Sequence, residues 1–481
     1  MNRYAIVLAA GQGTRMISKL YKVMHPVMGK PMVAYAVDAA LEAGVDQVVT
    51  VTGVGADLVQ DYLGNKSQYV LQEEQLGTAH AVMQAKEMLV DKEGISIILS
   101  GDAPLISPET IESLLDYHEA HQLKGSILTA HEADPYGYGR VIRNQDGTVA
   151  KIVEEKDASP EEKQVQEINT GTYCFDNQAL FQALDHVSND NAQGEYYLPD
   201  VIEILKNQGD LVGAYQMDDN TDALGVNDRV ALSRANTLMR RRINQAHMKN
   251  GVSLIDPEST YIDVNVTIGQ DTVIEPGVYL KGETEIGQDA HIGAHSIIED
   301  SQLGDGVVVK QSTIEEAIIG PNSDIGPNSH LRPGAILQES VHVGNYVEIK
   351  KSLVKSKAKL GHHAYVGDAE VGQGVNVSCG VIFANYDGKD KHRSVIGDYA
   401  FIGSNVTIVS PVTVEAGAFL AAGSTITEDV KQDSLAIARS RQVNKDGYTK
   451  NKDQGWKRSI LWQKVKPMRV SSFMPWVPTG L

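Results

Sequence analysis

The chain has 481 residues, which at roughly 100–200 residues per domain predicts two or more domains. A hydrophobic content of 42% and a charged content of 22% are typical of globular proteins and exclude global disorder. The net charge of −19 arises in residues 1–230, which hold 16 Lys and Arg against 35 Asp and Glu, whereas residues 231–481 hold 27 of each. Since the first half shows no basic face, the composition argues against nucleic-acid binding.

The sequence contains no run of about 18 apolar residues, so no membrane span is predicted. The first apolar run has only seven residues and is followed by Gly and Arg, which is too short for a signal peptide. The two cysteines, Cys174 and Cys379, form neither a disulfide framework nor a zinc-binding pattern. We therefore expect a reduced cytoplasmic protein.

Apolar runs alternate with segments of helical period in the first half. The runs that predict strands are residues 4–10, 48–51 and 95–99. Residues 32–43 have helical period, and Gly11-Gln12-Gly13 follows the first run. This order predicts an open α/β sheet with ligands at the carboxyl ends of its strands. Asp102 lies at such an end.

Residues 228–250 are predicted to form one helix, which begins at Asp228 as its cap and stops at Gly251. Its helically spaced apolar residues are Leu232, Ala235, Leu238, Met239 and Ile243. The three arginines 240–242 are predicted to lie on a solvated face. We expect this helix to be an arm between two domains.

Beyond this helix, an aliphatic residue recurs at every sixth position. The three longest series run from Ile268 to Ile298, from Ile319 to Ile349 and from Ile396 to Ile426. A period of six cannot be an α-helix, but it fits a parallel β-helix whose coils each contain three such steps. The aliphatic residues are expected to stack inside the coils. The period breaks near residues 379–393, where we predict an extruded loop.

Three groups in the first half have residue types suited to a nucleoside triphosphate. Leu8 to Met16 form a glycine-rich loop that exposes backbone N–H groups and contains Arg15, and Lys22 follows. The Asp102 carboxylate offers the oxygen ligands that a hard cation prefers. A structural turn and a helix-capping aspartate are the alternatives from these residues alone.

In the second half, residues 350–393 hold eight Lys and Arg against four Asp and Glu. Such a patch suits phosphorylated ligands, with a solvated face as the alternative. His362 and His363 follow a glycine, with Tyr365 close behind. A histidine with a pKa of about 6.5 suits general-base catalysis, although a structural role is the alternative.

Several motifs together resemble a known family. They are LAAGQGTRM at 8–16, Lys22, LQEEQLGT at 71–78, GDAPL at 101–105, YGR at 138–140, VE at 153–154, NTG at 169–171 and GVN at 225–227. Residues 1–230 resemble the nucleotidyltransferases that make nucleoside-diphosphate sugars. Over about residues 4–448, the chain resembles the bifunctional N-acetylglucosamine-1-phosphate uridyltransferase/glucosamine-1-phosphate N-acetyltransferase family.

The resemblance implies an α/β plus all-β architecture. A Rossmann-like uridyltransferase domain occupies residues 1–229 and a helical linker residues 230–250. A left-handed parallel β-helix with acetyltransferase activity occupies residues 251–448. The remaining tail, residues 449–481, contains all three tryptophans; a segment that binds lipid or a partner and a poorly ordered extension are its two interpretations.

For the first domain, the resemblance implies uridyl transfer from UTP to N-acetylglucosamine 1-phosphate, with Mg²⁺ held by Asp102 and Asn227. Arg15 and Lys22 are expected to neutralise the triphosphate. The implied nucleotide and sugar site comprises Leu8, Ala9, Ala10, Gly11, Lys22, Gln72, Gly77, Thr78, Ser100, Gly101, Asp102, Gly139, Glu154, Asn169 and Asn227. One departure is Tyr21, which stands where the family usually has the proline that pre-sets the backbone before Lys22.

For the β-helix, the resemblance implies acetyl transfer from acetyl-CoA to glucosamine 1-phosphate, with His362 of the GHxxY motif as the general base. The sugar phosphate is expected to bind Arg332, Lys350, Tyr365 and Asn376. The residues expected to bind acetyl-CoA are Cys379, Asn385, Tyr386, Ser404, Ala422 and Arg439. The family forms homotrimers with this site between chains, and its product feeds bacterial cell-wall synthesis.

The chain departs from the family near the acetyl-CoA positions, where Ser378, Val381 and Phe383 replace Gly, Thr and Thr. Cys379 is expected to be a small buried filler rather than a nucleophile. These departures leave a uridyltransferase with a purely trimerising β-helix as one alternative. A catalytically silent scaffold is another, although the intact set of charged residues in the first domain argues against it.

Overall fold

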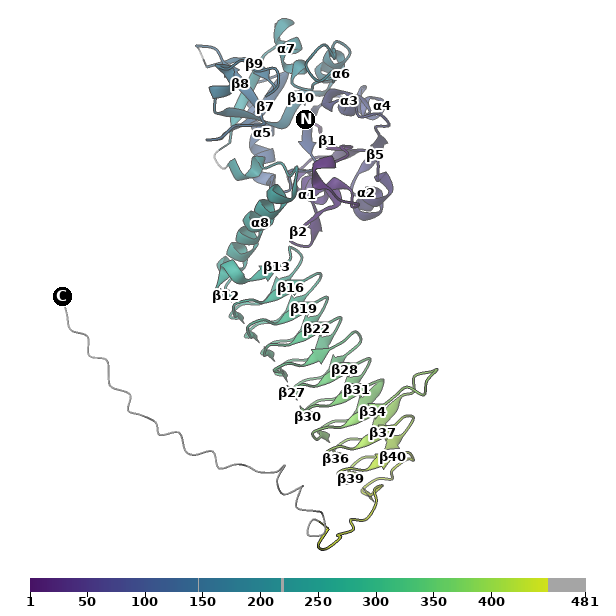
Figure 1. The fold of residues 1–481 in the computed structure, drawn as a ribbon. Helices are drawn as coiled ribbons and strands as arrows, with labels where there is room; N and C mark the ends of the chain where they lie inside the picture. The colour runs from purple at the N-terminus through teal and green to yellow at the C-terminus, as the bar shows by residue number, and fades with distance from the viewer. Residues whose placement is uncertain (146, 218–219, 449–481) are drawn as a thin grey trace, which may run out of the picture.

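The computed structural model describes residues 1–145, 147–217 and 220–448. An α/β domain, a long helix and a rod of stacked coils follow one another along the chain (Figure 1). Among the described residues, no helix is long and apolar enough to cross a membrane. The tail with its three tryptophans, for which a binding segment or a poorly ordered extension was expected, lies outside the described residues.

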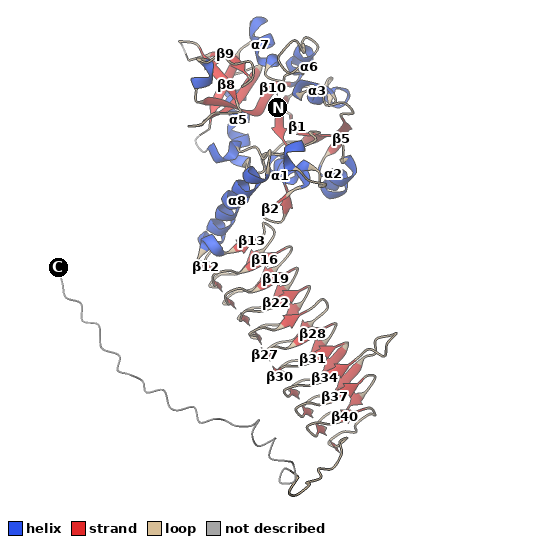
Figure 2. Ribbon diagram, in the orientation of Figure 1, coloured by secondary structure: helices blue, strands red, loops and turns tan. Residues whose placement is uncertain are grey.

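Eight α-helices occur in the described residues, and all belong to the first 250 residues (Figure 2). They are α1 (Met32–Glu42), α2 (Ala56–Leu63), α3 (Thr78–Met83), α4 (Lys86–Leu89), α5 (Pro108–Ala120), α6 (Asn177–Leu184), α7 (Asp200–Asn207) and α8 (Arg229–Lys249).

The first domain is built on a nine-stranded mixed sheet. Its strands are β1 (Arg3–Ala9), β4 (Gln47–Thr52), β5 (Gln68–Leu71), β6 (Ile95–Ser100), β7 (Gly125–His131), β8 (Gly139–Arg143), β9 (Val149–Val153), β10 (Glu167–Asp176) and β11 (Val212–Gln216). The order is β11-β7-β10-β6-β1-β4-β5, with β8 paired to β10 and β9. The three predicted strands and the predicted helix over residues 32–43 are confirmed as β1, β4, β6 and α1.

One edge of this sheet gathers the chain segments that form the site. Strands β6, β1, β4 and β5 run parallel, so their carboxyl ends lie together. Strand β10 runs antiparallel to β6, and a bulge between Asn169 and Tyr173 falls beside the end of β6. The alternation of apolar runs did not reveal this antiparallel strand, because a buried strand has the same composition in either direction.

The second half is a parallel β-helix with three faces, which we name the first, second and third faces. The first face comprises β12 (Ser253–Leu254), β15 (Val273–Ile274), β18 (His291–Ile292), β21 (Val308–Val309), β24 (Asp324–Ile325), β27 (His342–Asn345), β30 (Lys359–His362), β33 (Asn376–Val377), β36 (Phe401–Ile402), β39 (Phe419–Leu420) and β41 (Leu435–Ala436).

The other two faces alternate with the first along the chain. The second face comprises β13 (Tyr261–Ile262), β16 (Tyr279–Lys281), β19 (Ile297–Glu299), β22 (Thr313–Glu315), β25 (His330–Leu331), β28 (Glu348–Lys350), β31 (Tyr365–Gly367), β34 (Ile382–Ala384), β37 (Thr407–Val409) and β40 (Thr425–Ile426). The third comprises β14 (Thr267–Ile268), β17 (Glu285–Ile286), β20 (Gln302–Leu303), β23 (Ile318–Ile319), β26 (Ile336–Leu337), β29 (Leu353–Val354), β32 (Ala369–Val371), β35 (Ser394–Ile396) and β38 (Thr413–Val414).

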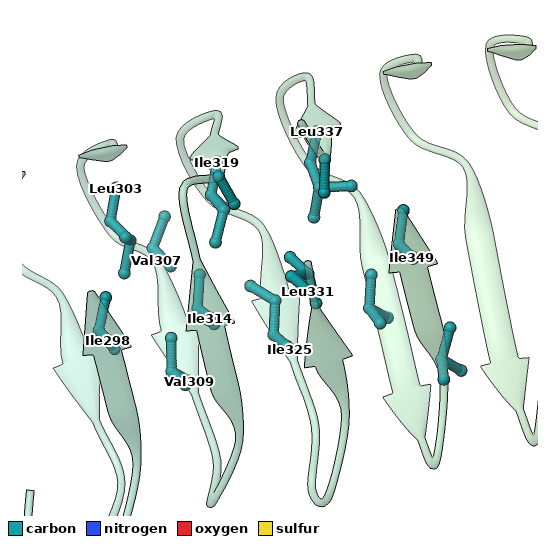
Figure 3. Packing of buried hydrophobic residues seen from close by; sticks show 14 of the residues in the cluster. Ile298, Leu303, Val307, Val309, Ile314, Ile319, Ile325, Leu331, Leu337 and Ile349 are labelled. Atoms are coloured by element: carbon teal, nitrogen blue, oxygen red, sulfur yellow. The ribbon is translucent and has the colours of Figure 1, made fainter. Parts of the chain in front are cut away.

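The aliphatic residues at every sixth position form the core of the rod. On the second face Ile298, Ile314, Leu331 and Ile349 stack in register, and all four are fully buried (Figure 3). Leu303, Ile319 and Leu337 form the equivalent column on the third face (Figure 3). Each coil thus covers the apolar interior of the next, which confirms the interpretation of the six-residue period.

The predicted loop near residues 379–393 is wrong in its first part. Val381 and Phe383 are fully buried, and Ile382 pairs in register with Tyr365 and Thr407, so this segment is part of a regular coil. Only residues 385–393 lie outside the coil, between β34 and β35. The aromatic Phe383 hides the period because it takes the interior position that an aliphatic residue occupies elsewhere.

Helix α8 joins the two halves, with the Asp228 carboxylate accepting hydrogen bonds from the N–H groups of Val230 and Ala231 as predicted. The solvated face predicted for arginines 240–242 is confirmed for Arg241, whose side chain is 59% exposed, but it is wrong for the buried Arg240 and the partly buried Arg242. Arg240 is 9% exposed, its guanidinium lies over the Tyr261 ring, and it pairs with Glu258. The Arg242 guanidinium pairs with Asp222 and donates to the Leu105 carbonyl. These arginines therefore tie the helix to both domains.

Burial in α5 gives the first domain a pH-dependent stability. His118 is 2% exposed, and burial lowers its pKa from 6.5 to about 4. Its neutral form is favoured in the folded state, so this stabilisation is present above pH 6.5 and is lost as pH falls towards 4.

The free energy of unfolding falls between pH 7 and pH 5. We predict that this fall is about 2 kcal/mol smaller in His118→Gln than in the wild type. Glutamine retains a partner for the Ser126 hydroxyl, which lies 2.9 Å from Nδ1. Urea denaturation followed by circular dichroism at both pH values measures the difference. His121→Gln, at the exposed residue that caps the C-terminus of α5, is the control and should leave the pH dependence as it is. Equal pH dependence in the His118 variant and the wild type would contradict the prediction.

Candidate active sites

Two adjoining cavities open at the carboxyl edge of the first domain's sheet, and Ser100 and Asp102 line both. The smaller, of about 270 Å³, is also lined by Leu8, Ala10, Gly11, Lys22, Gln72, Gly77 and Thr78. The larger, of about 650 Å³, is also lined by Arg15, Gly139, Glu154, Asn169 and Asn227. After the ligands that the family resemblance implies, we name them the nucleotide cavity and the sugar cavity, respectively.

Most of the expected residues of the first site thus lie at these cavities, with two exceptions. Ala9 and Gly101 line neither cavity. Ala9 is 1% exposed and accepts a hydrogen bond from the Tyr21 hydroxyl, while the Gly101 N–H donates to the Leu8 carbonyl. Both support the loop behind the cavities rather than form its surface.

The structure also accounts for Tyr21 at the position of the family's proline. Tyr21 has φ −58°, which is the value that a proline ring imposes. Its buried hydroxyl bonds to Ala9, and burial raises its pKa to about 12. A hydrogen bond to the end of β1 therefore fixes the backbone before Lys22. Across from Lys22, position 13 requires glycine, because its φ is +64° and a Cβ there would collide with the Lys22 side chain.

Two oxygen atoms converge on one cation position between the cavities. The Lys22 ammonium pairs with Asp102 Oδ2 and donates to Asn227 Oδ1 at 2.7 Å. The Val226 N–H bonds to the Asp102 carbonyl, which holds the segment of Asn227 against the end of β6. One carboxylate and one amide oxygen that converge in this way are the ligand types that Mg²⁺ takes from a protein when phosphates and water complete its shell.

In the described part of the chain, no group of three or more His, Cys, Asp and Glu residues could hold a metal ion. The donor set at Asp102 and Asn227 therefore fits Mg²⁺ that is shared with a phosphorylated ligand. It does not fit a zinc ion, which needs three or four nitrogen, sulfur or carboxylate ligands from the protein.

The inner wall of the nucleotide cavity is formed by polar groups with fixed directions. Gln72 is 3% exposed, and its amide Nε2 lies 3.3 Å from the Gly77 carbonyl and 3.0 Å from His80 Nδ1. Gly77 has φ +117°, and a Cβ there would collide with the Tyr196 backbone. Only glycine therefore allows the chain to pass at this point. Gln75 and Glu195 line the same cavity. Gln75 lies within the motif at 71–78 but was not predicted as a site residue, and Glu195 belongs to none of the motifs.

The sugar cavity is built where β8, β9 and β10 meet. Gly139 pairs in register with Asn169, and a Cβ on Gly139 would lie 3.0 Å from Glu154 Oε1. Burial raises the pKa of the Glu154 carboxyl, with Asp157 and Asp200 adding to the effect. Burial likewise raises the pKa of Asp200 to about 6.

The wall of the sugar cavity depends on a buried arginine, Arg140, to which the sequence motif assigned no role. Arg140 is 2% exposed; its Nη1 donates to the Tyr138 carbonyl and its Nη2 pairs with Glu155 at 2.8 Å. It therefore connects the loop before Gly139 to the residue after Glu154. Tyr136, Tyr138 and Arg234 also line this cavity; Arg234 belongs to α8, far along the chain, so no local motif pointed to it.

In the β-helix, four of the expected residues form one column. Leu360, Val377, Ile402 and Leu420 are aligned in register on the first face. The residues two positions later lie at the corner between the first and second faces, one per coil: His362, Cys379, Ser404 and Ala422. Backbone bonds from Asn405 to Cys379 and from Gly423 to Ser404, both 2.8 Å, confirm their stacking. We name these residues the corner column.

Further expected residues lie on the two faces that meet at the corner column. Arg332 and Lys350 follow Leu331 and Ile349, which pair on the second face, and Tyr365 lies one coil below. Asn376 belongs instead to the first face. Arg439 lies near the end of the column, where a Cβ on Gly423 would be 3.8 Å from its Cδ atom. The structure thus places Asn376 on a different face from the other sugar-phosphate residues.

The extruded loop carries Tyr386, which is exposed and forms a backbone bridge with Lys391. Asn385 is 5% exposed, and its amide donates to Asp368 at 2.6 Å. The cationic patch of residues 350–393 is partly neutralised, because Glu370 pairs with both Lys355 and Arg393.

One expectation about this segment is wrong. Cys379 is exposed in the chain, so it is not a buried filler. Val381 and Phe383 lie inside the coil with no exposed surface and therefore change the core rather than the ligand-facing surface. Ser378 is partly exposed, and its hydroxyl accepts a hydrogen bond from the Asn376 amide at 3.1 Å.

Comparison with family models agrees with this architecture. Residues 4–234 match the nucleotidyl transferase family, residues 255–355 the GMPPB C-terminal domain, and residues 393–428 six bacterial transferase hexapeptide repeats. The chain is thus a nucleotidyltransferase joined to a left-handed β-helix of hexapeptide repeats.

Curated relatives match nearly the whole chain. Bifunctional protein GlmU of Enterococcus faecalis is 58% identical over 93% of this chain and 98% of its own length. The proteins of the same name from Listeria monocytogenes serotype 4b and Halalkalibacterium halodurans are 57% and 54% identical, each over 94% of this chain and 99% of its own length. A solved UDP-glucose pyrophosphorylase in complex with UDP-glucose covers 50% of this chain at 18% identity and a TM-score of 0.42, which is too low to assign a fold.

The chain belongs to the GlmU family of bifunctional proteins. It is an enzyme with two transferase activities, uridyl transfer in the first domain and acetyl transfer in the β-helix.

The position of Arg140 generates a prediction about the sugar cavity. Lysine cannot make the two-pronged contact of a guanidinium, so Arg140→Lys should loosen the wall that carries Gly139 and Glu154. We expect the KM for the sugar phosphate to rise about tenfold, equivalent to about 1.4 kcal/mol, and the KM for UTP to change by less than twofold.

The matched control is Arg143→Lys in the same strand, whose guanidinium pairs with Glu167 outside the cavity. Steady-state kinetics with each substrate varied in turn separate the two KM values. If both KM values rose equally in the Arg140 variant, or neither rose, Arg140 would have no specific role in positioning the sugar site.

Proposed function

We propose that the two cavities of the first domain bind UTP and N-acetylglucosamine 1-phosphate side by side. The observation that carries this assignment is their shared wall at Ser100 and Asp102, beside the Lys22 ammonium. An oxygen of the sugar phosphate attacks the α-phosphorus of UTP, the bond to the bridging oxygen breaks, and pyrophosphate leaves. No protein nucleophile is needed, so catalysis depends on positioning and charge neutralisation.

The cationic side chains and the amide groups then have separate tasks. Arg15 and Lys22 neutralise phosphate charge, while Gln72, Gly77 and Thr78 hydrogen-bond the edge of uracil. Gly139, Glu154 and Asn169 bind the hydroxyl and acetamido groups of the sugar. Because Glu154 is half-buried, leaving it without a partner is costly, and a sugar that offers a hydroxyl is favoured over one that lacks it.

Asp102 and Asn227 hold Mg²⁺ in this proposal. When bound, the ion neutralises charge that develops on the phosphates during transfer. Asp102 contributes the charge of the site and Asn227 a neutral oxygen, which leaves the remaining coordination positions to phosphate oxygens and water. The acidic surface of the first domain thereby accepts two anionic substrates.

For acetyl transfer, we propose His362 as the general base at the corner column. The amino nitrogen of glucosamine 1-phosphate attacks the thioester carbon, His362 takes the proton from that nitrogen, and CoA leaves as the thiol. Arg332 and Lys350 bind the phosphate of the sugar, and Tyr365 borders it. His362 is exposed at the end of β30, and Tyr365 follows it at the start of β31 on the second face, which supports this assignment.

The rest of the corner column suits an extended cofactor. Cys379, Ser404 and Ala422 present small side chains at successive coils, spaced by about 4.8 Å. The column therefore offers a narrow track of roughly 14 Å from His362 to Ala422. Acetyl-CoA lies along it in our proposal, with its thioester at His362, Arg439 at the far end, and Asn385 and Tyr386 bordering it from the loop.

We propose a homotrimer in which the first face of one chain packs against the second face of the next. The position of Asn376, on the face adjacent to Arg332 and Lys350, supports this arrangement. Phe401 and Phe419 stack with ring centroids 4.5 Å apart on the first face, and both remain more than a third exposed. A neighbouring chain would cover these rings, and three such head-to-tail contacts close a ring.

Separate substitutions should divide the two activities. His362→Ala is expected to abolish CoA thiol release while pyrophosphate release stays within twofold of wild type. Asp102→Asn is expected to lower pyrophosphate release at least 100-fold and leave thiol release unchanged. The two assays are run on the same preparations of each variant. Loss of both activities in either variant would contradict the assignment of two independent sites.

Mixed trimers test the shared site. His362→Ala and Asn376→Ala chains are each expected to be inactive in acetyl transfer when alone. When they are unfolded and refolded together, a site with an intact His362 from one chain and an intact Asn376 from the next regains activity, at roughly a quarter of the wild-type level for random mixing. The refolded single variants are the controls. Absence of recovery from mixtures that form trimers would show that both residues act within one chain.

A further inference from the structure

We propose that the Lys22 ammonium occupies the metal position while no divalent cation is bound, and that it moves to the nucleotide phosphates when the cation takes its place. This inference rests on the proposed function, because it takes Asp102 and Asn227 as the ligands of Mg²⁺. It adds that one lysine serves in turn as the stand-in for the metal and as a phosphate ligand.

The geometry of the cation position carries the inference. The Lys22 Nζ atom contacts Asp102 Oδ2 and Asn227 Oδ1, the two oxygens that are assigned to the metal. The side chains of Lys22 and Asp102 are only 11% and 23% exposed, so water has little access to this pair. Mg²⁺ takes its oxygen ligands at about 2.0–2.1 Å. The ammonium and the metal therefore cannot occupy the space between these two oxygens together.

The surroundings give Lys22 a second place to go. Lys22 lines the nucleotide cavity along with the backbone of Gly11. The Tyr21 hydroxyl bond to Ala9 holds the backbone in place, so the change involves the flexible side chain alone. Gly13, which has no Cβ, leaves the room beside the Lys22 stem that such a rotation needs.

The exchange couples the two ligands through charge. With Lys22 in place, the pair with Asp102 is neutral. When a divalent cation displaces it, one positive charge is freed, and that charge is unfavourable unless an anion receives it. The triphosphate is such an anion, so nucleotide and metal each strengthen the binding of the other to the protein. This effect adds to the affinity that the metal and the nucleotide have for each other in solution. Without nucleotide, Lys22 should weaken metal binding.

Binding of Mn²⁺ alone to the nucleotide-free full chain tests this inference, with free Mn²⁺ measured by electron paramagnetic resonance. Lys22→Met should lower the Mn²⁺ dissociation constant at least tenfold relative to wild type. The matched control is Arg15→Met, which removes the same charge from the adjoining cavity; Arg15 has no hydrogen bond or ion pair among the described residues. The control should change the constant by less than threefold, and circular dichroism verifies that each variant is folded.

Two outcomes overturn the inference and can be told apart. If Lys22→Met binds Mn²⁺ no more tightly than Arg15→Met, while Asp102→Asn abolishes binding, the metal site stands and Lys22 is not its stand-in. If Asp102→Asn binds Mn²⁺ as wild type does, the metal site assigned in the proposed function is itself wrong.

Discussion

The stacking of one buried aliphatic side chain on the next, coil after coil, is the interaction on which the second half of the molecule depends. It fixes the register between coils, and the register alone brings His362, Cys379, Ser404 and Ala422 to one corner although they are spread over about 60 residues of sequence. The same apolar core continues through α8 into the first domain, where Met28, Leu105 and Val226 pack against it. The corner column and the interdomain arm are thus parts of one packed body.

In the first domain, residues far apart in the sequence are brought together by the ends of strands and by a backbone hydrogen bond instead of by stacked coils. Parallel strands end at one sheet edge, and an antiparallel strand with a bulge brings Asn169 back to that edge. Asp102 and Asn227, 125 positions apart, meet because the Val226 N–H bonds to the Asp102 carbonyl. A backbone contact between two loops, rather than a side-chain motif, therefore creates the position at which a cation is held.

Features with a local period could be predicted from the sequence, whereas features created by tertiary packing could not. Strands β1, β4 and β6, helix α8 with its Asp228 cap, and the coils were all predicted, because each has a period or a cap that is visible within a few residues. Arg240 was misjudged as solvated, because its partner Tyr261 lies in another domain. Phe383 was misjudged as part of a loop because its aromatic ring replaces the expected aliphatic residue. The site residues came from resemblance to a family. Arg234 was found only from the cavity that it lines, and Arg140 only from the hydrogen bonds that it makes behind the cavity wall.

The length of the rod determines how the product of the first reaction reaches the site of the second. Six coil spacings on the second face, about 29 Å, separate the first coil from the coil of Tyr365, and α8 adds a further 31 Å or so to the first domain. Within a chain, an acetylated sugar phosphate formed at the corner column must therefore diffuse through open solvent to the other site. There it mixes with molecules released by every other copy of the enzyme, so the second step draws its substrate from the bulk pool of the intermediate.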